Sequence, residues 1–218
     1  MILKMRKSPG IFGYQGLGYS LKEITFDSYE KAVMASAKLD SLQKLYYRSK
    51  DPAALRQIFE IRAKMVRHGT IALVMGISFL DSIFYQYGCY KLHPDDVDML
   101  FRKNGFIKAW SRILKETKNI NFEKKHPVRQ RVERINEARK AIVHPKAKWI
   151  TTETEELDKE EHEWETFRAS IVDLRPTFDA CIELLNQPDP KINGAGVGGQ
   201  SNFSCFYGRT GHSGHVGM

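Results

Sequence analysis

The segment TIALVMGISFLDSIFYQYG, residues 70–88, is the most apolar part of the chain and most constrains its fold. It is nearly long enough to cross a bilayer, which takes about 20 apolar residues. However, Asp81 lies inside it, and its glycine and polar content is high for a segment that contacts lipid. We therefore expect no membrane span and predict instead the central helix of a bundle core.

Helical patterns also recur along the rest of the chain. Apolar residues follow steps of three and four from Asp27 to Tyr46, and Asp51 with Pro52 is typical of a helix start. Gly69 is expected to end the helix that begins there. Pro94, followed by acidic residues, predicts another start, and Gly105 an interruption. Further helices are predicted around residues 107–114, 128–143 and 157–185, the last with a kink or break at Pro176.

The fold class that these patterns predict is all-α, because no segment alternates apolar and polar residues between turn signals. We expect an up-and-down bundle of about five to seven helices, formed by one domain over residues 21–186. The 218 residues, 42% of them hydrophobic, suffice for one such core. Residues 1–20 are predicted to be a flexible arm. Residues 187–218, which hold half of the 16 glycines, are predicted to be a disordered tail.

The charge balance favours a polyanionic partner, nucleic acid first, because the formal net charge is +8. Between Lys118 and Lys148 there are ten Lys or Arg against three Glu, whereas residues 153–165 hold eight acids against one Lys. These two segments either complement each other as neighbouring helices or form a basic nucleic-acid surface with an acidic flank. Three widely spaced cysteines without a CxxC pair favour a reducing compartment, so we expect a cytoplasmic protein.

Arg139 is unusual because it falls within the apolar stripe of its helix. With Val128 at zero on a helical wheel, Val132 lies at about 40°, Ile135 at about 340° and Arg139 at about 20°. Ile142 and Val143 extend the same stripe. A buried guanidinium keeps its charge, so it needs a carboxylate, a phosphate or an opening to solvent.

Asp81 is a candidate partner for Arg139, because it lies in the corresponding stripe of its own helix, with Val74, Ile77 and Leu80. Two opposite charges on apolar helix faces predict a pair across the bundle. Such a pair has a purely structural alternative, in which it only fixes how the two helices align.

His144 precedes Pro145, and a residue before proline is disfavoured in the α region. The helix should therefore end at about Val143, with His144 at its carboxyl end, where free carbonyls favour an imidazolium. An arginine and a histidine this close can hold a phosphate, stabilise its developing charge and move a proton. Those functions are most of what RNA cleavage by its own 2′-hydroxyl requires, without a metal.

The sequence ARKAIVHP, residues 138–145, resembles the signature of HEPN domains, an arginine and a histidine four to six residues apart near a helix end. The apolar helix with Asp81 is similar to the family's other marked helix, and the resemblance covers roughly residues 70–185. It implies a helical bundle that pairs as a homodimer, with Arg139 and His144 as the catalytic pair of a metal-independent ribonuclease. Asp81 and Lys140 would be supporting residues. Such ribonucleases occur in toxin–antitoxin, abortive-infection and CRISPR defence systems, which makes an antitoxin a possible partner.

Lys140 leaves a second function open. Active HEPN domains usually have Asn, Asp or His directly after the arginine, and lysine can bind phosphate but cannot accept a hydrogen bond. The alternative is an inactive HEPN-like module that pairs with a protein or binds nucleic acid. A plain helical scaffold with a structural Asp81–Arg139 pair is the third possibility.

Basic residues next to the motif are the expected contacts to RNA: Arg131, Arg134, Lys146 and Lys148. We expect no cofactor, since the chain holds no Walker phosphate loop and no GxGxxG before a helix. We expect no metal either, since HExxH is absent and His162 lies on an acidic helix that is expected to be solvated.

Overall fold

The computed structural model describes the backbone of residues 12–143 and 154–188, and the side chains of residues 20–143 and 162–188. These residues form six helices and no strand, which confirms the all-α prediction. The helices are α1 (Phe12–Ser49), α2 (Pro52–Lys91), α3 (Pro94–Asn104), α4 (Phe106–Lys118), α5 (Pro127–Val143) and α6 (Thr154–Asn186).

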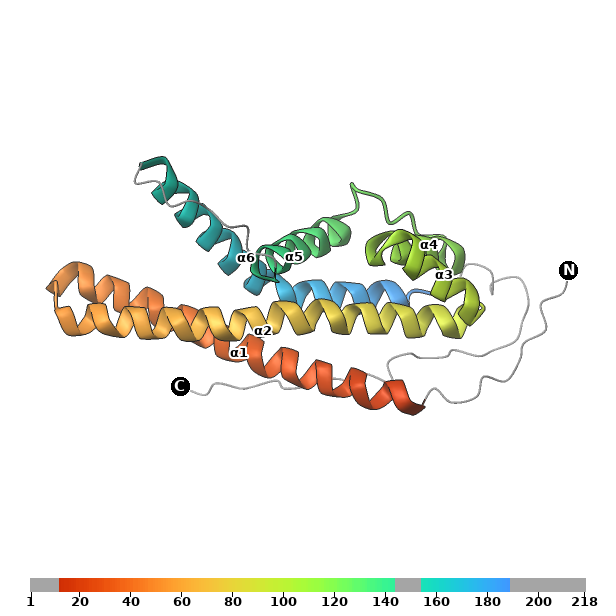
Figure 1. The fold of residues 1–218 in the computed structure, drawn as a ribbon, viewed down its shortest axis with the longest axis horizontal. Helices are drawn as coiled ribbons and strands as arrows, with labels where there is room; N and C mark the ends of the chain where they lie inside the picture. Colours follow the sequence, from red (N-terminus) through yellow and green to blue (C-terminus); the bar gives the residue numbers. More distant parts are fainter. Residues whose placement is uncertain (1–11, 144–153, 189–218) are drawn as a thin grey trace, which may run out of the picture.

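Four long helices alternate in direction along the bundle, and α2 is central among them (Figure 1). Helices α1 and α2 form a long hairpin, α5 runs back along α2, and α6 returns in the direction of α2. The short helices α3 and α4 are inserted between α2 and α5 and lie at the end of α2 that is farthest from the hairpin turn. In this arrangement α2 contacts both α4 and α5.

The helix starts follow the predicted capping residues. The Asp51 carboxylate accepts a hydrogen bond from the Ala53 backbone N–H at 2.8 Å, and Pro52 is the first residue of α2. Helix α3 begins at Pro94, and Gly105 separates α3 from α4 with a φ of 68°, a conformation that glycine adopts without strain. Both boundaries therefore confirm what the sequence predicted.

The predicted stop at Gly69 is wrong, because α2 continues through it for 40 residues. Gly69 is buried and permits a close approach of α6: a Cβ at this position would lie 2.4 Å from Ile171 Cδ1 and 2.7 Å from Phe167 Cζ. The glycine thus serves packing between two helices rather than termination. Segment 70–88 is confirmed as the central core helix, with Leu73, Leu80 and Phe84 fully buried.

Residues 12–20 of the predicted arm are helical instead, because α1 already begins at Phe12. Their glycines disfavour a helix by only about 1 kcal/mol each, and extending an existing helix is much easier than nucleating one. The rest of the arm lies outside the described residues, as does the tail from residue 189.

Helix α6 passes Pro176 without a break, contrary to one of the two outcomes that we considered. Proline removes the hydrogen bond to the carbonyl of Val172, four residues earlier. Both Pro176 and Val172 are exposed, so that carbonyl lies on the solvent side of the helix.

Helix α6 is connected to α1 by Arg168. Its Nη2 donates hydrogen bonds to Ser36 Oγ at 3.0 Å and to Asp40 Oδ1 at 2.7 Å.

Within the described residues, α2 is the one helix whose length and composition would suit a membrane crossing. Half of its most apolar window is buried inside the bundle. The core helix of a bundle passes the same test of length and composition, so this finding is weak evidence for a span.

Candidate functional site

Helix α5 carries Arg139 and has the predicted buried face: Val128, Val132 and Ile135 are buried. The residues that would show where the helix ends, from His144 on, lie outside the described part of the chain. Val143, which the sequence placed in the same apolar stripe, is 44% exposed. Arg139 is partly buried in this stripe.

The guanidinium of Arg139 has few partners. Nη1 donates a hydrogen bond to Asn136 Oδ1 at 3.3 Å, and Nε is buried without a hydrogen-bond partner. Within the described side chains, no carboxylate forms an ion pair or hydrogen bond with it. A partly buried cation that lacks an anion in contact is costly to maintain unless a ligand provides one.

Asp81 lies near Arg139 but binds a different partner. Trp110 Nε1 donates a hydrogen bond to Asp81 Oδ1 at 3.2 Å. Burial raises the pKa of the Asp81 carboxyl, while the Trp110 hydrogen bond and the charge of Arg139 oppose that shift and only partly offset it. The predicted contact pair is therefore replaced by an electrostatic interaction across a gap, with Trp110 holding the carboxylate.

Trp110 is the residue of this site that the sequence analysis did not identify. Its side chain is fully buried, stacks on Phe84 with ring centroids 4.1 Å apart, and meets the edge of Phe106 at 5.1 Å. A buried indole N–H needs an acceptor, and Asp81 is a partly buried acceptor in the middle of an apolar helix. That complementarity is the signal that could have linked the two residues.

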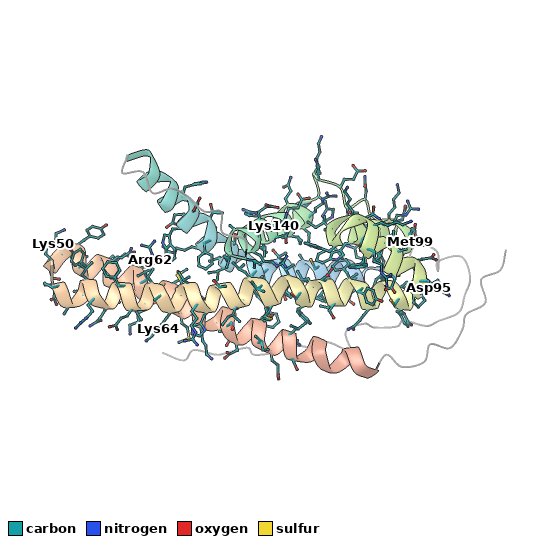
Figure 2. All side chains as sticks on the ribbon, in the orientation of Figure 1. Lys50, Arg62, Lys64, Asp95, Met99 and Lys140 are labelled. Atoms are coloured by element: carbon teal, nitrogen blue, oxygen red, sulfur yellow. The ribbon has the colours of Figure 1, made fainter. Side chains whose placement is uncertain are left out.

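The remaining predicted residues are dispersed. Lys140 is exposed on α5 (labelled in Figure 2) and pairs with Glu137 at 2.7 Å. Arg134 pairs with Asp173 of α6 at 3.3 Å, and Arg131 is partly buried. The predicted residues that lie outside the described part of the chain are His144, Lys146 and Lys148. Among the predicted residues that the structure describes, Asp81 of α2 is the one from another helix that interacts electrostatically with Arg139.

A basic pocket between α4, the α4–α5 connection and the start of α5 was also not predicted. Its volume is about 670 Å³. Lys108, Arg112 and Lys115 contribute from α4 with helical spacings of four and three residues, so they share one face. That spacing was visible in the sequence, but the helix was interpreted only through its apolar residues.

Among the described residues, no group of three His, Cys, Asp or Glu side chains is arranged to hold a metal ion. His162 of α6 is exposed. The cysteines Cys89 and Cys181 are free thiols, and burial raises the pKa of Cys181 to about 12, which makes that thiol unreactive.

Neither a protein-family model, nor a curated protein, nor a solved structure matches this chain.

Proposed function

We propose that the chain is a HEPN-like, metal-independent endoribonuclease whose Arg139 binds the phosphate of the RNA bond that is cut. The observation that carries this proposal is the state of Arg139. Its guanidinium lies partly buried among apolar residues, and among the described side chains its Nε has no hydrogen-bond partner and its one hydrogen bond is to the neutral amide of Asn136. An RNA phosphate supplies the anion and the acceptors that this group lacks.

The proposed reaction is an internal transesterification. The 2′-hydroxyl of one nucleotide attacks the adjacent phosphorus, and the bond from phosphorus to the next 5′-oxygen breaks. The 2′-hydroxyl proton goes to a base, and the departing 5′-oxygen receives a proton from an acid. His144 serves as one of these groups, five residues after Arg139, and Arg139 stabilises the charge that develops on the phosphoryl oxygens.

Asp81 and Lys140 have supporting roles in this proposal. The carboxylate of Asp81, held by Trp110, attracts the guanidinium without contacting it, which leaves the guanidinium nitrogens available to phosphate. Lys140 adds a second positive charge for the RNA backbone. We further propose a cytoplasmic homodimer that acts in defence or growth arrest, with an antitoxin as a possible partner.

The test is cleavage of labelled RNA in EDTA by the wild type and by Arg139→Ala and His144→Ala. We expect wild-type cleavage to persist in EDTA and to fall by at least about 100-fold in both variants, the usual effect of removing a charge-stabilising donor. Arg67→Ala is the matched control, because it removes an exposed arginine of α2, and it should cut normally. Absence of wild-type cleavage, or equal cleavage by all variants, would contradict the proposal.

One observation favours a second candidate, an inactive HEPN-like module that binds RNA or a protein. Lys140 occupies the position after the arginine, and its ammonium pairs with Glu137 on the exposed face. It therefore neither accepts a hydrogen bond nor orients a histidine. RNA binding that depends on Arg139 without any cleavage would support this candidate over the ribonuclease.

A further inference from the structure

The basic pocket is the strongest feature of the molecule that the proposed catalytic pair does not use. Ten residues line it, of which six are Lys or Arg and one is Glu. They are Lys108, Ser111, Arg112, Lys115, Asn121, Phe122, Glu123, Lys124, Lys125 and Arg129. So many cations around one cavity repel each other unless an anion lies between them, which makes the pocket suited to a phosphate-rich ligand.

Two sets of cations line this pocket. Lys108, Arg112 and Lys115 lie on one face of α4, while Lys124 and Lys125 form a turn in the connection to α5. Arg112 shares its charge with Glu116 of the same helix. The four lysines are exposed, so their ammonium groups can reach a ligand without any rearrangement of the helices.

The connection that carries Lys124 and Lys125 is firmly anchored. Asn119 adopts the left-handed conformation that ends α4, with backbone hydrogen bonds from Asn119 to Lys115 and from Ile120 to Leu114, both at 3.2 Å. Phe122 is buried and fixes the middle of the connection.

Arg129 completes this anchor from α5. Its Nη1 donates to the Phe122 carbonyl at 3.0 Å and lies 3.4 Å from the Ser111 hydroxyl, and its Nε pairs with Glu133 at 2.8 Å. The pocket is therefore preorganised by hydrogen bonds and is more than a chance grouping of surface lysines.

The pocket and Arg139 share two helices. On α4, Trp110 binds Asp81 near Arg139, while the next residue, Ser111, lines the pocket. On α5, Arg129 precedes Arg139 by ten residues, which is about 15 Å along the helix. At about 3.4 Å per nucleotide of a stacked strand, that distance corresponds to roughly four nucleotides.

We propose that the basic pocket binds the phosphodiester backbone of single-stranded RNA a few nucleotides from the bond at Arg139. This inference depends on the proposed function, since it assigns the substrate's second anchor. Exposed lysines act as point charges that position a strand without selecting bases. A single strand fits because attack by the 2′-hydroxyl requires the sugar and phosphate to rotate into line. The one aromatic ring of the pocket, Phe122, is buried, so the lining lacks the apolar centre that a protein partner would cover.

The experiment measures RNA binding by fluorescence polarisation at several salt concentrations, with a labelled single strand of about 12 nucleotides whose 2′-oxygens are methylated so that it cannot be cut. The test variant is Lys124→Glu with Lys125→Glu. The matched control is Lys38→Glu with Lys64→Glu, which changes the net charge equally at exposed positions away from the pocket, with Lys64 on the side of α2 opposite α5 (Figure 2). Thermal melting verifies that both proteins are folded.

We expect the pocket variant to bind at least about tenfold more weakly at low salt and to reduce the slope of log affinity against log salt by about 1.4, or 0.7 for each lost phosphate contact. The control should bind like the wild type. Equal weakening in both variants would show a general charge effect and overturn the proposal. A preference for an acidic protein or for duplex RNA over the single strand would overturn it as well.

Failure of the proposed function remains distinguishable from failure of this inference. If the wild type binds RNA through the pocket lysines but never cuts, cleavage fails and the pocket assignment holds. If the wild type cuts and the pocket variant binds and cuts long RNA normally, the pocket assignment fails alone. Cleavage of a dinucleotide, too short to reach the pocket, should be the same in the wild type and the pocket variant.

Discussion

Arg129 and Arg139 lie on the same helix, yet their guanidinium groups have opposite surroundings. Arg129 contacts a carboxylate, a hydroxyl and a backbone carbonyl, and its side chain is only 13% exposed. Arg139 contacts one amide oxygen and keeps a buried Nε without a partner. The first arginine is satisfied by the fold, and the second is not.

This difference distinguishes an arginine that the fold already uses from one whose guanidinium still has donors to offer a ligand. A guanidinium with several partners in the fold stabilises the folded state and has little left to offer a ligand. A guanidinium without an anion adds little stability, and it gains most when a phosphate arrives. The comparison therefore predicts that stability and function depend on different arginines of α5.

Replacement of Arg129 by alanine should produce the largest loss of stability. The change leaves the Phe122 carbonyl and Glu133 without their partner and frees the α4–α5 connection, which should lower the free energy of unfolding by about 2–4 kcal/mol. Arg139→Ala is the matched variant and should cost less than about 1 kcal/mol, because it removes only one hydrogen bond. Urea unfolding measures both values. Equal losses of unfolding free energy in the two variants would contradict the predicted difference between the two arginines.

The helices themselves were largely predictable from the sequence, because their signals are local. Asp51 with Pro52, the Pro94 start and the glycine at 105 each depend on the chemistry of a few neighbouring residues.

The errors occurred where the outcome depends on residues far apart in the chain. Gly69 resembles a stop signal until Ile171 and Phe167 of α6 are seen packed against it. Asp81 was expected to pair with Arg139, since nothing local indicates that Trp110 reaches it. The pocket was missed because its lysines come from separate segments, and only the folded connection brings them together.

Substitutions of Asp81, which lies near Arg139, should change stability less than the loss of Arg129 does. Its folded pKa is raised, so its contribution to stability is full below its ordinary pKa of 3.8 and is lost as the pH rises through the folded value. Asp81→Asn keeps an acceptor for Trp110 and removes this loss, so stability at neutral pH should be unchanged or slightly higher. Asp81→Leu should cost about 1–3 kcal/mol, because the buried indole N–H loses its acceptor. If Asp81→Asn also lowers RNA cleavage, the carboxylate has a functional role at a small cost in stability. A large destabilisation by Asp81→Asn would contradict the prediction that the amide can replace the carboxylate as the acceptor for Trp110.

The smallest expected effect on stability comes from His126, in the connection that Arg129 anchors. Its ring lies against Phe122, with centroids 5.0 Å apart, its Nδ1 is buried without a partner, and burial lowers its pKa. As the pH falls, His126 is therefore protonated in the unfolded chain before it is protonated in the folded one. Its contribution to the free energy of unfolding should be fully present above pH 6.5 and should decline as the pH falls below that value. We expect a decrease in Tm of at most about 2 °C from this residue between neutral and mildly acidic pH. His126→Gln does not titrate and should flatten that part of the Tm profile, whereas Asp81→Asn should leave it in place. If His126→Gln leaves the dependence of Tm on pH unchanged, protonation of His126 does not destabilise the α4–α5 connection. The stability of that connection would then come from Phe122 and Arg129.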